Sequence, residues 1–279
     1  MQRVWILTVA LLVITWNGAG VGGTPGDAEE NFNQALKLGA QGDFPGARQA
    51  LEQTLKLDPF HPPAIVGLGT LQDLKANKIK PETAVHVFKA MGHGSQSQWR
   101  EYLEEINLAL KLDPRYAAAY NHRANAYTEL DLFELALADY EAALTLDPRD
   151  AVTYLNRGVT YRRSGDLESA ISDYNRALTL NPDFAAVYYM RGVAYGMKGE
   201  MDRAVSDFDR ALTLHPRFAE AHFNKAMACE QAGRLDQATA AYLGFLKSAA
   251  PEQVRQIRLA RERVKALENL TAQAAATAR

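Results

Sequence analysis

The sequence predicts an all-α fold, built as a solenoid of about six stacked helical hairpins with a capping helix at the C-terminal end. The first observation is an internal repeat with a period of 34 residues (154 − 120 and 188 − 154), whose copies begin at Tyr120, Tyr154 and Tyr188. The second is a shared Leu-Thr-Leu-x-Pro ending, at Pro148, Pro182 and Pro216. A period of this length is typical of helix–turn–helix units that stack and offer a surface to a partner.

Each period contains two amphipathic helices. In residues 151–184, one face of the first helix carries Tyr154, Gly158 and Tyr161, and one face of the second carries Ala170, Tyr174 and Ala177. The small residues allow two backbones to approach, and the tyrosines fill the space between hairpins. Gly165 supplies a left-handed cap between the helices, and Pro182 ends the second helix.

This pattern resembles the tetratricopeptide repeat. The family's small residue in the first helix appears as Ala35, Gly69, Ala124, Gly158, Gly192 and Ala226, and its alanine in the second helix as Ala47, Ala136, Ala170, Ala204 and Ala238. Its terminal proline appears as Pro59, Pro114, Pro148, Pro182 and Pro216. The resemblance implies a right-handed superhelix of six repeats, at 28–61, 62–116, 117–150, 151–184, 185–218 and 219–252, with a capping helix and tail at 253–279.

The second repeat is longer than the others. Pro59 and Pro114 are 55 residues apart (114 − 59), so 21 residues exceed the period (55 − 34). We expect helices over 63–76 and 99–112, with an insertion at 77–98 that holds a short helix over 81–91 and a flexible loop over 92–95. Such an insertion favours a flap that contacts a partner or caps the array. No cysteine or carboxylate pair accompanies His86 and His93, so we predict no metal site.

The N-terminal segment 1–24 has the pattern of an export signal. Arg3 precedes an apolar run from Val4 to Trp16, and a small-residue stretch follows at 18–23. This order favours a cleaved signal peptide and a periplasmic or secreted protein, and an uncleaved membrane anchor is the alternative. The single cysteine, Cys229, excludes an intramolecular disulfide, and we expect it to be a small buried apolar residue.

The net charge and the C-terminal helix indicate which partners the chain binds. The chain has 31 basic and 33 acidic residues, a nearly neutral balance that argues against nucleic-acid binding. Residues 251–271 predict a helix with an apolar side at Val254, Ile257, Val264, Leu267 and Leu270. We interpret it as the polar-faced cap of the array, and a basic helix on an acidic membrane is the alternative.

The resemblance also indicates a peptide-binding groove. The family positions that face a ligand correspond here to Asn121, His122, Asn125, Leu155, Asn156, Val159, Arg162, Tyr189, Met190, Val193, Phe223, Asn224 and Met227. One family subtype grips a C-terminal carboxylate, but Asn121, Ala186 and Met190 stand where it has cations, so we exclude that mode. The apolar end at Tyr189, Met190, Phe223 and Met227 suits a peptide, or it packs under the capping helix; both remain open.

A repeated charge pattern accompanies the hairpins. Arg123, Arg157, Arg191 and Lys225 share one position of the first helix, and Asp139, Asp173 and Asp207 share one position of the second. We expect them to pair within or between neighbouring hairpins as structural contacts.

No phosphate loop, nucleophile motif or metal-binding cysteine pattern is present in the sequence. We therefore predict a non-catalytic protein without cofactor or metal. The leading hypothesis is an exported adaptor that binds a protein or peptide segment in its groove and helps to assemble a cell-envelope complex. The alternative is a scaffold that self-associates by end-to-end stacking.

Overall fold

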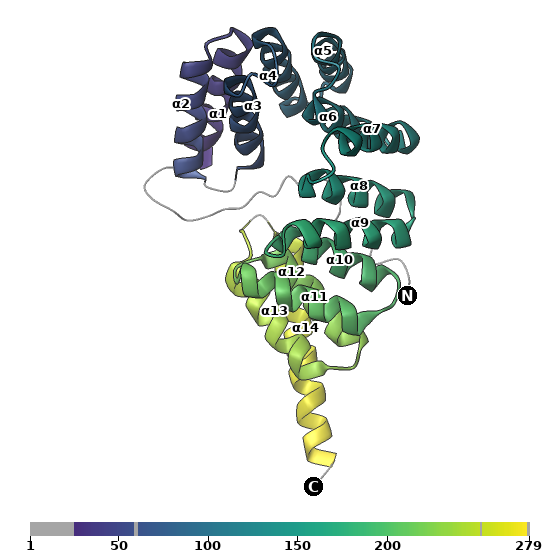
Figure 1. Ribbon diagram of the computed structural model, residues 1–279. Helices are drawn as coiled ribbons and strands as arrows, with labels where there is room; N and C mark the ends of the chain where they lie inside the picture. Colours follow the sequence, from purple (N-terminus) through teal and green to yellow (C-terminus); the bar gives the residue numbers. More distant parts are fainter. Residues whose placement is uncertain (1–24, 59–60, 252, 278–279) are drawn as a thin grey trace. The chain divides into compact units, whose positions relative to one another are not determined.

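The computed structural model describes residues 25–58, 61–251 and 253–277. Within these ranges the chain forms fourteen α-helices in succession and no strand (Figure 1). The predicted all-α fold is therefore confirmed. The chain divides into two compact units, unit 1 up to Pro148 and unit 2 from Arg149.

Unit 1 contains seven helices. They are α1 (Pro25–Ala40), α2 (Phe44–Leu57), α3 (Pro62–Lys75), α4 (Pro81–Ser95), α5 (Trp99–Leu112), α6 (Ala117–Glu129) and α7 (Phe133–Leu146). Three antiparallel hairpins dominate its packing, α1–α2, α4–α5 and α6–α7. Side chains that are inaccessible to solvent, such as Leu51, Phe88 and Ile106, form its core.

The structure of residues 77–98 differs from the predicted insertion. α4 is a full helix that includes residues 92–95, predicted as a loop, and α5 pairs with α4 rather than with α3. Val87, Phe88 and Ala90 of α4 are completely buried, so α4 is part of the core and not a flap. The additional element is therefore α3, and the hairpin that precedes 117–150 by one period is α4–α5.

The start of α4 is fixed by Asp113, which follows α5. Its carboxylate accepts hydrogen bonds from the backbone N–H of Lys80 at 2.8 Å and from the hydroxyl of Thr83 at 2.5 Å. Burial raises the pKa of Asp113. The hydrogen bonds from Thr83 and Lys80 and the charge of the Lys80 ammonium lower it by more, so the pKa of Asp113 lies below its usual value. Asp113 thus acts as an N-terminal cap supplied by another helix.

Unit 2 contains α8 (Ala151–Ser164), α9 (Leu167–Leu180), α10 (Ala185–Met197), α11 (Met201–Leu214), α12 (Ala219–Gln231), α13 (Leu235–Ser248) and α14 (Val254–Thr277). The hairpins α8–α9, α10–α11 and α12–α13 stack in order, and α14 packs on α13. One hydrophobic cluster runs through all of them, with Tyr174, Phe208 and Phe245 among its fully buried rings.

Gly158 permits the close approach of α8 and α9. A β-carbon at this position would lie 2.6 Å from the ring of Tyr174 and 3.2 Å from the carbonyl oxygen of Ala170. Gly165, between the helices, adopts the left-handed conformation, with φ of 93°. Both predicted roles of glycine are confirmed.

The predicted charge ladder forms within the hairpins. Arg123, Arg157 and Arg191 each bind both carboxylate oxygens of Asp139, Asp173 and Asp207, respectively, at 2.7–2.8 Å. Hydrogen bonding to the aspartate raises the pKa of each arginine. Lys225 differs, because Ala241 stands where its aspartate is expected (207 + 34), and it pairs with Asp209 of the preceding hairpin at 2.5 Å.

α14 continues the stack at the position of a further first helix. Ala260 lies one period after Ala226 (226 + 34) and is completely buried, and Leu267 is 1% exposed. Val254 and Leu270, which we placed on the apolar side, are 66% and 52% exposed. The helix therefore packs through Ile257, Ala260, Val264 and Leu267. None of the helices in the described ranges combines the length and hydrophobicity needed to cross a membrane.

Candidate peptide-binding wall

The thirteen residues predicted to line a groove lie on the first helices of four hairpins. Three belong to α6 in unit 1, and ten to α8, α10 and α12 in unit 2. Eight of the thirteen are half-buried, and the five buried ones are Asn121, Arg162, Tyr189, Met190 and Val193. We call the face of α8, α10 and α12 that carries the ten residues the inner wall of unit 2.

Three buried residues of α10 correct the predicted groove. Tyr189 is 4% exposed and lies between the rings of Phe208 and Phe218, with ring centroids 5.9 and 4.8 Å away. Its hydroxyl accepts a hydrogen bond from Asn224 at 2.8 Å. Because Met190 and Val193 are also only 6% and 5% exposed, this stretch of α10 belongs to the core and does not line an open surface.

The asparagines of α6 bind one another and a core tyrosine. Asn125 donates to the side-chain oxygen of Asn121 at 3.2 Å, and its own oxygen accepts from the hydroxyl of Tyr140 at 2.6 Å. His122, beside them, is half-buried. The asparagines predicted to face a ligand are thus engaged within α6 and, through Tyr140, with α7.

α8 presents the most accessible row of the inner wall. Val152, Leu155, Val159 and Arg162, which we call the α8 row, follow one another at intervals of three, four and three residues and so share one helical face. Val152 is 49% exposed, and Leu155 and Val159 are half-buried. Sequence reasoning missed Val152, although it occupies the second repeat position, one of the family's ligand-facing positions.

Arg162 ends the α8 row as a buried cation. The residue is 6% exposed, and its Nε and Nη2 atoms are buried without a hydrogen-bond partner. The hydroxyl of Tyr174 is in the same condition. Burial raises the pKa of Tyr174, and the nearby guanidinium of Arg162 acts in the opposite direction, so the two groups lie close together.

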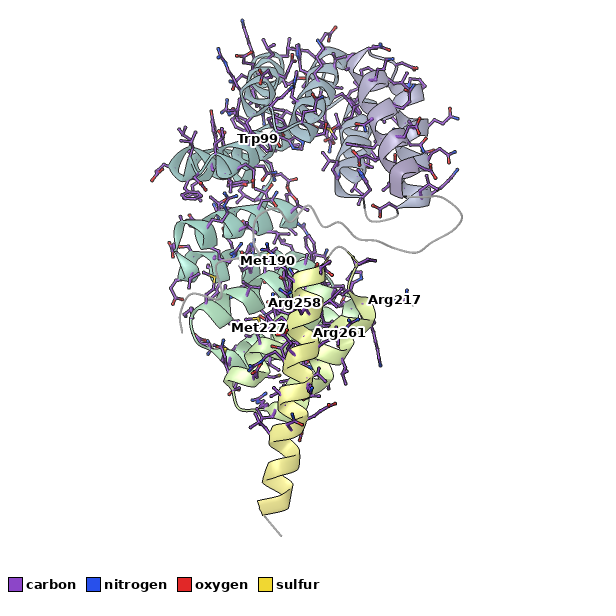
Figure 2. The ribbon with its side chains drawn as sticks, turned by 180° about the vertical axis from the view of Figure 1, so that it is seen from behind. Trp99, Met190, Arg217, Met227, Arg258 and Arg261 are labelled. Atoms are coloured by element: carbon purple, nitrogen blue, oxygen red, sulfur yellow. The ribbon has the colours of Figure 1, made fainter. Side chains whose placement is uncertain are left out.

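The α12 end of the inner wall is occupied by α14. Glu230 of α12 forms an ion pair with Arg263 of α14, with Nε of Arg263 3.2 Å from the carboxylate, and Tyr242 donates to it at 3.0 Å. Glu220 accepts from Gln253, just before α14, at 3.1 Å. Figure 2 shows Met227 and α14 from this side, with the exposed Arg258 and Arg261 on the helix. The capping interpretation therefore applies at this end.

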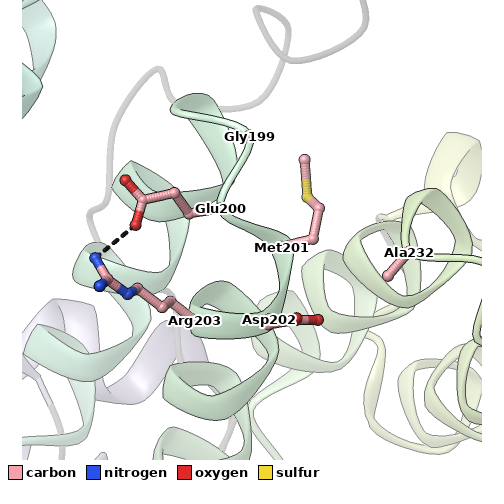
Figure 3. A pocket seen from close by; sticks show the side chains of 6 residues that line it. All are labelled: Gly199, Glu200, Met201, Asp202, Arg203 and Ala232. Atoms are coloured by element: carbon pink, nitrogen blue, oxygen red, sulfur yellow. Dashed lines mark hydrogen bonds and ion pairs between the residues drawn. The ribbon is translucent and has the colours of Figure 1, made fainter.

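A hollow of about 570 Å³ lies at the turn between α10 and α11 (Figure 3). Its charged lining is already paired, Glu200 with Arg203 at 2.7 Å and with Lys198 at 2.8 Å, and Asp202 with Arg234 at 2.5 Å. Hydrogen bonding to Lys198 lowers the pKa of Glu200. Both carboxylates are paired with neighbouring cations, an arrangement that serves the turn rather than proton transfer.

Histidines and the cysteine take structural positions. His86 of α4 contacts Glu105 of α5 at 2.6 Å, and His93 contacts Gln98 at 2.8 Å. Cys229 is completely buried, as predicted, and burial raises the pKa of its thiol. In the described ranges no three His, Cys, Asp or Glu side chains gather in a way that suits a metal ion.

Solved structures with the same architecture share little sequence with the chain. PilW, described as a widely conserved type IV pilus biogenesis factor, is 22% identical with a TM-score of 0.59, covering 68% of this chain and 91% of PilW. The MamA protein is 22% identical with a TM-score of 0.53, covering 60% and 91%. YrrB, described as a TPR protein with an unusual peptide-binding site, is 19% identical with a TM-score of 0.52, covering 69% and 97%.

Family models give the more specific match. Four models described as tetratricopeptide or TPR repeats match residues 117–150, 139–172, 160–199 and 198–253. These ranges contain the regular 34-residue copies and the helical hairpins from α6 to α13. Residues 117–253 of the chain therefore belong to the tetratricopeptide repeat family.

Proposed function

We propose that the chain is an exported, non-catalytic adaptor whose inner wall in unit 2 holds a segment of a partner protein during assembly of a cell-envelope complex. The observation that carries this proposal is the α8 row. It places an exposed valine beside two half-buried aliphatic side chains on one helical face. Aligned apolar residues of this kind suit the apolar side of a helix or of an extended peptide.

A binding role agrees with how the chain uses its polar groups. Ion pairs join first and second helices in each regular hairpin, and the charges around the hollow between α10 and α11 neutralise one another. A catalytic site instead needs a nucleophile, a base and an orienting group held together in one place. The stacked hairpins supply a wall, which is the geometry of a binding module.

Export is the part of the proposal that depends on sequence alone. The signal-like segment 1–24 lies outside the described residues, and the order of its charged, apolar and small residues supports it. The test is mass spectrometry of the mature protein from fractionated host cells. A fragment that begins after the small-residue stretch, found in the envelope fraction, agrees with export, and an intact chain in the cytosol contradicts it.

The test of the groove compares partner binding by variants of α8, on the inner wall, and of α13, the second helix of another hairpin. Val152→Ala with Leu155→Ala truncates the α8 row, and Leu243→Ala changes α13, where the native leucine is 41% exposed. The row variant should weaken partner binding at least about tenfold, because buried methyl and methylene groups stabilise a complex. Affinity capture from the host's envelope fraction should lose its partners with the row variant and keep them with Leu243→Ala. The same captured proteins with both variants would remove the groove from the proposal.

End-to-end stacking remains the second candidate because α14 exposes Val254, Leu259 and Leu270, at 66%, 39% and 52%. Apolar side chains at the end of an array suit a contact with another copy. Light scattering during size-exclusion chromatography separates the two functions. An adaptor keeps the mass of one chain on dilution, whereas stacking predicts a mass that rises with concentration.

A further inference from the structure

We propose that Arg162 is the anchor for a carboxylate, so that the partner segment on the inner wall carries an Asp or Glu side chain that binds this guanidinium. The inference rests on the proposed function and adds the chemistry of the partner. It concerns one buried cation and a side-chain carboxylate. It therefore differs from the family subtype that holds a C-terminal carboxylate with several cations, a mode that the sequence excludes.

The first argument is the state of Arg162 itself. It is more than nine-tenths buried, and two of its three guanidinium nitrogens, Nε and Nη2, have no hydrogen-bond partner. Its neighbour, the hydroxyl of Tyr174, is likewise buried, and it lies close to the guanidinium without a well-formed hydrogen bond. Buried cations are costly unless a counter-charge and hydrogen bonds compensate them.

The second argument is a comparison along the same helix. Arg157, five residues earlier on α8, binds both oxygens of Asp173 at 2.7 and 2.8 Å. The equivalent arginines of the neighbouring hairpins have the same arrangement within their hairpins. The chain thus supplies a carboxylate for each of these structural arginines, whereas within the described residues Nε and Nη2 of Arg162 have no hydrogen-bond partner.

The third argument is the use of the same repeat position two hairpins later. Glu230 lies two periods after Arg162 (162 + 34 + 34), and it too lies beside the tyrosine of its second helix, Tyr242. Its charge is met by Arg263, which arrives from α14 rather than from its own hairpin. Gly196, at the same position between them, has no side chain. A charge at this position therefore pairs with a group brought to the inner wall by another segment.

The positive charge of Arg162 also indicates which segment binds to the inner wall. Residues 1–24 contain no Asp or Glu, so that part of the chain has no acidic side chain to offer Arg162. The α8 row leads from Val152 through two aliphatic residues to the guanidinium. A complementary segment of a partner protein has apolar residues followed by an acid. Arg is well suited to such a site, since its fork binds a carboxylate through two hydrogen bonds.

A peptide selection tests this chemistry without a known partner. Random peptides displayed internally on phage have no free carboxyl terminus, so an enriched acid must be a side chain. The purified full chain is the bait, alongside Arg162→Met and a charge-matched control, Arg115→Met, whose native arginine is exposed in unit 1. We expect one acidic position to be enriched on the wild type and on Arg115→Met but not on Arg162→Met.

A double-mutant cycle then tests direct pairing. Arg162→Met should weaken a selected peptide by about 10- to 100-fold, the effect of losing hydrogen bonds to a charged group. Asp→Asn in the peptide should cost the wild type the same factor and cost Arg162→Met almost nothing. Selected peptides without an acidic preference, or additive losses in the cycle, overturn the inference and leave the groove in place. The absence of any binder removes both the groove and the anchor.

Thermal unfolding of the free chain supplies an arm that needs no peptide. Because the guanidinium is uncompensated, Arg162→Met should raise the unfolding midpoint by about 2–4 °C. Arg115→Met should leave it unchanged. A fall of the midpoint in Arg162→Met would mean that the free protein already compensates this charge, and the inference would then be withdrawn.

Discussion

Replacing Arg157 by alanine tests whether the charge ladder is structural. The side chains of Arg157 and Asp173 are 20% and 8% exposed, and two hydrogen bonds of 2.7 and 2.8 Å join them. The guanidinium also lies over the rings of Tyr154 and Tyr161, at 5.6 and 5.9 Å. The substitution therefore leaves a buried carboxylate unpaired and removes two cation–π contacts.

The expected loss follows from these exposures. Breaking a fully buried pair costs about 3–5 kcal/mol, and an exposed pair contributes about 0–1 kcal/mol. For a mostly buried pair with bidentate geometry, we expect Arg157→Ala to lower the unfolding free energy by about 2–4 kcal/mol. Arg100→Ala is the matched control, because Arg100 and Glu104 are 87% and 65% exposed, and it should cost less than about 0.5 kcal/mol.

Urea unfolding followed by far-UV circular dichroism measures both variants, and hydrogen exchange locates the loss in α8 and α9. A cycle with Asp173→Ala should show strong coupling between the two residues. Partner affinity per folded molecule should stay unchanged. Equal, small losses for Arg157→Ala and Arg100→Ala would refute the structural role, as would binding that disappears while helicity is complete.

Three further outcomes follow from single contacts. Gly158→Val places a β-carbon against the ring of Tyr174 and should lower the unfolding free energy by about 1–3 kcal/mol, as measured by thermal unfolding. Gly69→Ala should leave the unfolding free energy unchanged, because the space around Gly69 is open. Asp113→Asn should destabilise unit 1 by about 1 kcal/mol near neutral pH. Because the pKa of Asp113 is lowered in the folded state, its contribution is present above about pH 4 and fades as pH falls below that value, so wild type and variant should converge in acid; a constant difference would contradict this. Cys229 should resist alkylation in the folded chain and react quickly in concentrated urea, and rapid labelling without urea would show that it is accessible.

The regular part of the fold could be predicted because its information is local. From residue 117 to residue 218 the period is explicit, and the small residue, the first tyrosine and the final proline of each copy return after 34 positions. The ladder followed for the same reason, since Arg157 and Asp173 recur with the period and lie on the facing helices of one hairpin.

The prediction for the second repeat was wrong because local sequence signals indicated a loop where the chain is helical. Gly92 and Gly94 suggested a loop, yet tertiary packing keeps the chain helical there, with Val87, Phe88 and Ala90 buried. A usable signal was present, since Ala90 precedes Ala124 by one period (124 − 90). Extending the period backwards from residue 117 would have identified α4–α5 as the hairpin.

The candidate site was predicted by helical face but not by accessibility. Tyr189 does occupy a ligand-facing position of the repeat, but its ring turns between Phe208 and Phe218 from other helices. Arg162 likewise lies close to Tyr174, a side chain that comes from α9. Such contacts are set by tertiary packing, and no spacing within one helix contains them.

Site-specific photocrosslinking in the native host tests the central claim most directly. A benzophenone side chain replaces Val152 on the inner wall in one variant and Leu243 on α13 in the other, since both native residues are exposed. We predict that the probe at 152 forms adducts with a partner protein and that the probe at 243 does not. Adducts from position 243 alone would place the partner on another face and contradict the account.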